Sequence, residues 1–321
     1  MKHSLAIFDL DGTILYTLVD LKNSMNFTLK KFGFPVSDNC FGGLYIWQTA
    51  FESEFAIFEN TVILRGSDGG RHFYQCPIGE NAAAAVRRLV EEEGEKLRFC
   101  GLCPDEKKFF EQNFGDEFSF VNNRDNSEYV YEREPLCTFA GKKYQQKRNH
   151  VNKFTRLYGE PEAVVLCADN LSLISGTEHL WLSEHDSTDI RIIHENSALK
   201  KALDSFEKLG LLGVAVRVGE KTVGFGIGER LSDDTVIEHF EKADRDMDGC
   251  YAVVIREFAK ILPQSIKYIN REEDMGLEGL RKSKLSLKPA FMEEKYDGIY
   301  VGQGTDNIPL DRGLRRQKSR C

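Results

Sequence analysis

Hydrophobic and polar positions change their period several times along the chain, and each change predicts a different element. In the first half, short alternating runs bounded by turn residues predict strands at 54–58, 61–65, 71–78 and 97–102. Apolar positions spaced three or four residues apart predict helices at 80–93 and 105–114, and residues 118–131 are predicted to be extended.

The second half shows a similar order of patterns. Strands are predicted at 163–167, 213–218, 222–227, 235–241 and 265–271. Helices are predicted at 197–209, 249–262 and 276–285. Antiparallel strands followed by a helix and a further strand, twice over, predict an α+β protein with two similar folds in tandem.

Composition and charge narrow the class of protein. The length of 321 residues suits one large domain or two of ordinary size, and a hydrophobic content of 41% is enough for their cores. The net charge of −8 argues against nonspecific nucleic-acid binding by the whole surface. Neither a cleavable signal nor an apolar run near the ~20 residues of a membrane span is found, so we expect a cytoplasmic protein. Cys100 and Cys103 form a single CxxC, and a zinc site would need a second pair.

The first residues carry a catalytic signature, IFDLDGT, at Ile7–Thr13. Asp9 could attack a phosphoryl group and Asp11 could protonate the leaving oxygen, with both binding Mg²⁺. The opening to Pro35 resembles haloacid-dehalogenase-type phosphatases, phosphoglycolate phosphatase in particular. That family also needs a Ser or Thr, a Lys and a distal acidic pair, and the later chain supplies no clear match. A Mg²⁺ phosphatase is therefore the alternative function, and we do not expect turnover.

A basic segment stands out in this acidic chain. Residues 135–159 contain no acid, and on a helix the apolar stripe through Tyr144 and Val151 also includes Lys147 and Arg148. A cation facing inward is expensive unless it is paired or borders a polar cleft. Snorkelling or a structural ion pair is the alternative interpretation.

Two further segments place charge at positions predicted to be buried. Lys284 shares a helix face with Leu277 and Leu280, and Asn270 and Arg271 end a strand. In the strand at 235–241, regular alternation places Glu238, Phe240 and Lys242 on one face and Ile237, His239 and Glu241 on the other. Charge on both faces of a central strand suggests that one set lines a cleft.

Several sequence segments are specific enough to indicate a family. The segments KKYQQKRNHVNKF, EKAD and NREEDMGLEGLRKSKLS, with SDNCFGGLYIWQTAF, resemble a bacterial family allied to the C-terminal domain of phosphatidylglycerol lysyltransferase over 36–296. The resemblance implies tandem GNAT-like folds, with mixed and largely antiparallel sheets, related to Fem-type aminoacyltransferases that take amino acids from tRNA. It also implies an aminoacyl-tRNA or other activated acyl donor, and a small-molecule, peptide or lipid-headgroup acceptor.

The loop that would cradle a coenzyme pyrophosphate argues against acetyl-CoA. It corresponds to residues 243–249, where Asp244, Asp246 and Asp248 would repel a diphosphate. We expect no cofactor, with Mg²⁺ only under the phosphatase alternative, and no metal ligands beyond Asp9 and Asp11.

The sequence therefore predicts an acyl- or aminoacyltransferase. Glu238, His239 and Glu241 are the candidate catalytic residues, and the candidate binding residues are Lys147, Arg148, Asn270, Arg271 and Lys284. The expected organisation is a truncated phosphatase-like strand-helix segment at 1–36, GNAT-like domains at 37–135 and 136–302, and a basic, disordered tail at 303–321. A non-catalytic protein that binds RNA ends or anionic metabolites is the second alternative.

Overall fold

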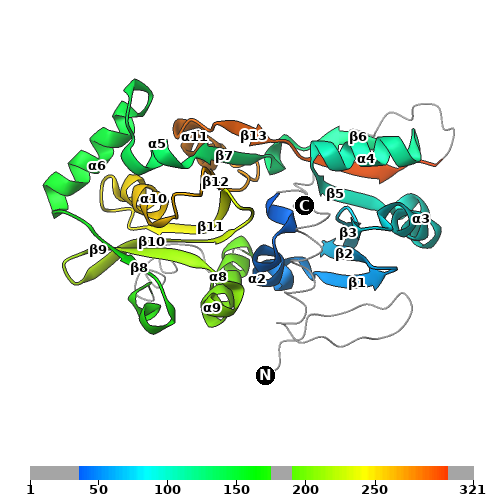
Figure 1. Ribbon diagram of the computed structural model, residues 1–321, viewed down its shortest axis with the longest axis horizontal. Helices are drawn as coiled ribbons and strands as arrows, with labels where there is room; N and C mark the ends of the chain where they lie inside the picture. The colour runs from blue at the N-terminus through cyan, green and yellow to red at the C-terminus, as the bar shows by residue number, and fades with distance from the viewer. Residues whose placement is uncertain (1–35, 175–189, 303–321) are drawn as a thin grey trace. The chain divides into compact units, whose positions relative to one another are not determined.

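The computed structural model describes residues 36–174 and 190–302, and the chain divides into two compact units (Figure 1). Among the described residues, unit 1 comprises 36–127 and 293–302, and unit 2 comprises 128–174 and 190–292. This division differs from the predicted boundaries in two places. The strand after residue 127 pairs in the sheet of unit 2, and the strand near residue 298 pairs in the sheet of unit 1. Pairing partners far apart in sequence leave no periodic signal, so this exchange was not predicted.

Unit 1 contains one mixed sheet in the order β1-β2-β3-β5-β14-β6, with β4 paired to β2. Its strands are β1 (Glu54–Phe58), β2 (Thr61–Asp68), β3 (Arg71–Tyr74), β4 (Ile78–Gly79), β5 (Arg98–Leu102), β6 (Phe118–Asn122) and β14 (Tyr296–Tyr300). Its helices are α2 (Phe41–Phe51), α3 (Ala82–Glu93) and α4 (Pro104–Phe114). Only β3 and β5 pair in parallel among the described strands of this sheet.

The core of unit 1 lies between the sheet and the helices α3 and α4. Val86 and Leu89 of α3 and Phe110 of α4 are fully buried together with Phe99 of β5. The rings of Phe99 and Phe110 are 4.7 Å apart. The apolar residues whose spacing predicted these two helices therefore form the helix faces that pack on the sheet.

Unit 2 contains a second mixed sheet in the order β13-β7-β12-β11-β10-β9-β8. Its strands are β7 (Glu128–Glu132), β8 (Glu162–Val165), β9 (Leu212–Val218), β10 (Lys221–Arg230), β11 (Thr235–Ala243), β12 (Tyr268–Asn270) and β13 (Phe291–Glu293). Its helices are α5 (Arg133–Thr138), α6 (Gln145–Tyr158), α8 (Ile190–Asp204), α9 (Phe206–Leu209), α10 (Cys250–Ile261) and α11 (Glu278–Ser286).

Helix α10 covers one face of this sheet, because glycines of β10 let it approach closely. A Cβ atom on Gly224 would lie 2.5 Å from Val254 Cγ2 of α10, so any side chain there would collide. Phe154 of α6 and Leu136 of α5 complete this core. On the opposite face, Glu195 of α8 forms an ion pair of 2.5 Å with Lys242 of β11.

Several predicted elements differ from the structure in detail. The predicted strand at 71–78 splits into β3 and β4, with Pro77 between them, and the extended run 118–131 is interrupted by a 3₁₀ turn at Arg124–Asn126. The helix predicted at 197–209 begins at Ile190 and is divided between α8 and α9. Helix α2 was not predicted, since two glycines and several aromatic residues lower its helix propensity. None of the helices in the described part of the chain is long and apolar enough to span a membrane.

Candidate functional site

The candidate site lies where the parallel pairing of β11 and β12 ends (Figure 1). The two strands pair over three positions, the last of which joins Ile237 to Asn270. The next residues along the two strands are Glu238 and Arg271. The candidate site therefore lies directly after the last backbone hydrogen-bonded pair of the two strands.

A β-bulge brings the two glutamates of β11 to the same face. Gly226 pairs with Glu241, but Gly228 pairs with Glu238, so β11 has one extra residue in this interval. Because Gly226 and Gly228 face the same way, their partners do too. The prediction that Glu238 and Glu241 lie on opposite faces is wrong for this reason, since regular alternation does not hold across a bulge.

Arg271 binds both glutamates. Its Nε donates to Glu238 Oε2 at 2.5 Å, and its Nη2 donates to Glu241 Oε2. The side chains are 3% exposed for Glu238, 12% for Glu241 and 10% for Arg271. The guanidinium carbon lies 5.9 Å from the ring centre of Tyr131 on β7. With both glutamates ionised, this Arg271 cluster (Glu238, Glu241 and Arg271) carries one net negative charge.

The second carboxylate oxygen of Glu238 is buried and has no hydrogen-bond partner among the described residues. It lies close to the backbone of β10, since a Cβ atom on Gly226 would be 3.2 Å from it. The same Cβ would lie 3.0 Å from the ring of Phe258. A glycine at this position therefore leaves room for the carboxylate beneath α10.

Burial dominates the protonation of the cluster. It raises the pKa of Glu238, although Arg271 and Lys284 lower it. Burial also raises the pKa of Glu241 to about 7, and the neighbouring Glu238 adds to the increase against the lowering effect of Arg271. The pKa of Arg271 is raised by both glutamates, although burial opposes them. Arg271 therefore stays charged, and Glu241 exchanges its proton near neutral pH.

Lys284 of α11 is buried as predicted, but it binds backbone oxygens. Its Nζ donates to the carbonyl oxygens of Arg271 and Glu273, the latter at 2.5 Å. Burial lowers the pKa of this ammonium. The hydroxyl of Tyr131 in turn donates to the carbonyl oxygen of Lys284 at 2.8 Å. Lys284 thus fixes the segment that carries Arg271.

Asn270 also holds this segment. Its Nδ2 donates to Glu128 of β7, and its Oδ1 accepts from the backbone N–H of Glu272 at 2.9 Å. The sequence identified Asn270 but not Glu128, because the pairing of β7 with β12 was not predicted. Tyr129 and Tyr131 alternate in β7, and this pattern alone does not distinguish a site wall from ordinary core.

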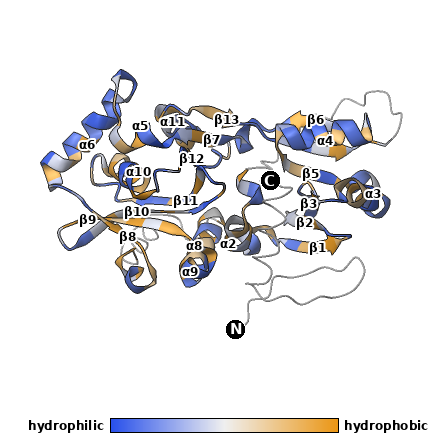
Figure 2. Ribbon diagram, viewed as in Figure 1, coloured by the Kyte–Doolittle hydropathy of each residue, from blue (hydrophilic) through white to orange (hydrophobic). Residues whose placement is uncertain are grey.

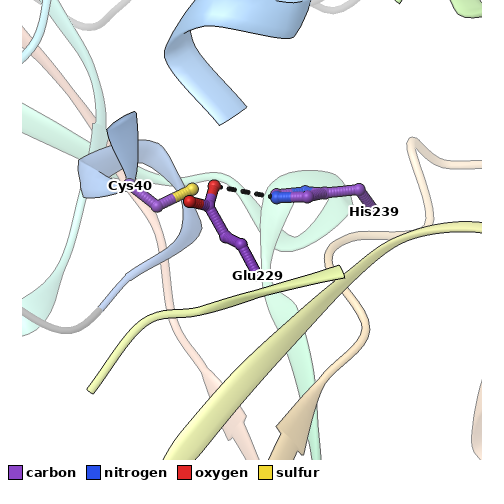
Figure 3. Close-up of side chains that lie close together, drawn as sticks. All are labelled: Cys40, Glu229 and His239. Carbon is purple, nitrogen blue, oxygen red and sulfur yellow. Dashed lines mark hydrogen bonds and ion pairs between the residues drawn. The ribbon is translucent and has the colours of Figure 1, made fainter. Parts of the chain in front are cut away.

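His239 lies between two carboxylates instead of in the Arg271 cluster. Figure 3 shows its ring beside Glu229 of β10, with Nε2 3.0 Å from Glu229 Oε1. Its Nδ1 is 2.7 Å from Glu272 Oε1, and the side chain is 1% exposed. Both ring nitrogens are therefore engaged, which is not the arrangement of an imidazole that awaits a substrate proton.

The two cations of α6 have different surroundings. Arg148 Nη1 donates to the carbonyl oxygens of Phe139 and Gly141, the latter at 2.6 Å, so it secures the end of α5. Lys147 is half-buried and forms no hydrogen bond or ion pair with any residue in the described part of the chain. Its pKa is lowered by burial and by Arg271, while Glu241 opposes the change. Lys147 therefore borders the Arg271 cluster with an ammonium that lacks a bound counter-ion there.

The acidic loop between β11 and α10 is partly neutralised. Asp244 forms an ion pair of 2.7 Å with Lys221, and Asp248 forms one of 2.5 Å with Lys153.

The cysteines of the CxxC are both buried, and burial with the nearby Glu106 raises the pKa of Cys103 to about 12. Asp9 and Asp11, the residues of the phosphatase alternative, lie outside the described residues.

Residues 30–297 match the family model described as "Phosphatidylglycerol lysyltransferase, C-terminal". The chain belongs to this family. The match begins a few residues before the predicted start at residue 36, inside the stretch that resembles the phosphatase opening.

A solved structure of a related protein aligns with most of the chain. It is a conserved protein of unknown function from Bacteroides thetaiotaomicron, 33% identical over 89% of this chain and 98% of that chain, with a TM-score of 0.81. The structure of L-PGS from Bacillus licheniformis aligns with 90% of this chain and 93% of that chain at 14% identity and a TM-score of 0.60. These likenesses confirm the predicted fold class, an α+β protein of tandem GNAT-like folds.

A curated relative extends beyond the aligned region. An uncharacterized protein of Mycoplasmoides gallisepticum is 25% identical over 180 residues, which cover 55% of this chain and 57% of the relative. The chain thus spans little more than half the length of that relative.

Proposed function

We propose that this protein transfers an acyl or aminoacyl group to an amine or hydroxyl at the Arg271 cluster. The observation that carries the proposal is Glu241, a carboxylate with a pKa of about 7, bound to Arg271 at the end of the β11–β12 pairing. Membership in a family described by a lysyltransferase supports the reaction class.

The chemistry needs a base near neutral pH. An acceptor amine attacks the carbonyl carbon of an activated ester, the new C–N bond forms, and the C–O bond to the leaving hydroxyl breaks. Glu241 would take the proton from the amine and return one to the leaving oxygen. A general base works best when its pKa lies near the working pH, and such groups contribute typically ~10²–10⁴-fold.

The cations divide two further tasks. Arg271 keeps its charge between the two glutamates and would orient Glu241 while stabilising the developing oxyanion. Lys147 has an ammonium without a bound partner among the described residues, so it would hold an anionic group of the donor. Asp244, Asp246 and Asp248 disfavour a diphosphate in the loop before α10, so we propose an aminoacyl ester donor in place of acetyl-CoA.

The test is transfer by the purified full chain. Total tRNA charged with one radiolabelled amino acid at a time would serve as the donor, with phosphatidylglycerol vesicles, free amino acids and polyamines as acceptors. Glu241→Gln should lower the transfer rate by at least ~10²-fold. Lys147→Met should mainly raise the donor concentration needed for half-maximal rate.

The control is a substitution of an exposed glutamate in the same unit. Glu278 pairs with Lys282 on the surface of α11, and both side chains are more than 70% exposed. Glu278→Gln should therefore leave transfer unchanged. If transfer occurs with Glu241→Gln at the wild-type rate, or if none of these donors and acceptors reacts, the proposal is wrong.

A further inference from the structure

His239 is a buried titratable group that the proposed reaction does not use. It lies at the bulge of β11, and its two ring nitrogens are 3.0 Å from Glu229 and 2.7 Å from Glu272 (Figure 3 shows the contact with Glu229). A neutral imidazole has only one N–H, so two hydrogen bonds to carboxylates require a second proton in the group. Such charge-assisted hydrogen bonds are stronger than neutral ones.

The partner Glu272 directly follows Arg271 and has an unusual backbone. Its φ of 54° lies in the left-handed region, which non-glycine residues occupy only at an energetic cost. This conformation persists only when surrounding contacts impose it. The imidazole of His239 supplies the side-chain contact, and Asn270 Oδ1 supplies the contact to the backbone N–H at 2.9 Å.

The Arg271–Glu272 segment is therefore held in several directions. The backbone N–H of Arg271 donates to Tyr129 O at 2.9 Å, and the carbonyl oxygen of Glu272 accepts from Tyr129 N at 3.1 Å. Lys284 binds the carbonyl oxygens on either side of Glu272. Within the described part of the chain, His239 holds the Glu272 side chain, whereas the Arg271 side chain reaches Glu238 and Glu241.

We propose that His239 is a positioning residue, which clamps Glu272 and thereby sets the guanidinium of Arg271 between Glu238 and Glu241. Because Glu272 directly follows Arg271, holding the Glu272 side chain also limits the movement of the Arg271 backbone. With Glu272 released, the segment can relax from the left-handed conformation and rotate the Cα–Cβ bond of Arg271. A guanidinium that binds two carboxylates through a planar fork tolerates little rotation before one of the bonds is lost.

The role can be read directly from Arg271 without any substrate. In ¹H–¹⁵N spectra of the full chain, the Nε–H of Arg271 should exchange slowly, because it is buried and donates to Glu238 at 2.5 Å. Arg271→Lys identifies the signal by its disappearance. His239→Gln should accelerate its exchange at least about tenfold, since a hydrogen bond to a charged group is worth that factor or more. Glu272→Gly, which accepts the backbone conformation but lacks the carboxylate, should have the same effect.

A matched control separates the clamp from a general loss of stability. Glu195 pairs with Lys242 of β11 at 2.5 Å, on the face of the sheet opposite α10. Glu195→Gln should leave the Arg271 exchange rate unchanged, and chemical denaturation of each variant gives its global stability. If His239→Gln does not fold, Glu272→Gly carries the test alone.

The results discriminate clearly. Faster exchange of Arg271 Nε–H in His239→Gln and Glu272→Gly, and not in Glu195→Gln, supports the clamp. Unchanged exchange in the first two, or equal acceleration in all three, overturns it. The inference rests on the proposed function only for the importance of Arg271. Accelerated exchange with undiminished transfer would refute the proposed site and leave the clamp intact.

Discussion

The raised pKa of Glu241 makes a quantitative prediction about stability. In the folded protein this pKa is about 7, whereas the ordinary value is 4.5. At about 1.36 kcal/mol per pH unit, that difference amounts to about 3 kcal/mol. The folded state binds the proton more tightly than the unfolded chain, so the stability from protonation is fully present below about pH 4.5 and is lost as the pH rises through about 7.

Glu241→Gln isolates this contribution. Glutamine keeps an oxygen that can accept from Arg271 but does not titrate, and it also removes the charge that repels Glu238. On raising the pH from about 5 to about 8.5, the wild-type protein should lose about 2–3 kcal/mol of unfolding free energy relative to the variant. At about pH 8.5 the variant should be at least as stable as the wild type.

Urea denaturation at a series of pH values measures the difference. Both proteins are unfolded at each pH, and the difference in unfolding free energy is plotted against pH. Glu278→Gln on the exposed surface of α11 serves as the control and should give a nearly flat difference. The reasoning is refuted if the difference between wild type and Glu241→Gln is also flat, or if it changes in the opposite direction.

Three further substitutions test the surroundings of the cluster. Arg271→Met leaves two buried glutamates without their cation and should destabilise by about 3–5 kcal/mol at pH 8, with a smaller effect at pH 5 in urea denaturation; equal losses at both pH values would contradict this. Lys147→Met should change stability by no more than about 0.5 kcal/mol, because this ammonium has no bound partner among the described residues, and a larger loss would mark a structural role. Gly228→Ala should lower the melting temperature more than Gly226→Ala, since its Cβ would lie 2.0 Å from Ile237 O whereas that of Gly226 lies 3.0 Å from the Phe258 ring; the reverse order would show that the backbone of β11 yields easily.

The sequence predicted much of this site because buried charge is rare. Glu238, Arg271 and Lys284 attracted attention as charges at positions that periodicity assigns to buried faces, and the structure places all three together. The same argument identified Lys147. Helix α6 is largely hydrophilic, as Figure 2 shows, but Lys147 falls on its narrow apolar stripe. The cost of burying an ion, about several kcal/mol without a partner, is what makes such positions informative.

The parts that were not predicted depend on contacts between distant segments. The bulge that aligns Glu238 with Glu241 is a register shift relative to β10, and one strand alone contains no sign of it. Likewise Asn270 was assigned to binding, but its partner Glu128 lies on a strand 142 residues earlier. Local periodicity therefore identified which residues are unusual, and only the sheet register shows what each one binds.

The same geometry explains why the cluster weakens the fold and suits catalysis. Two glutamates share one arginine, so when both are ionised one negative charge is buried without full compensation. That imbalance, with burial, raises the pKa of Glu241 to about 7, which lowers stability above that pH. It also gives a carboxylate that can accept and return a proton near neutral pH, which an ordinary surface glutamate cannot do efficiently. A second cation paired with Glu241 would restore stability and remove the base, and Lys147, whose pKa Glu241 raises, forms no ion pair with it among the described residues. If Lys147 holds the donor's anionic group, donor binding should draw its charge away from Glu241, so that donor occupancy would keep the pKa of the base near neutral.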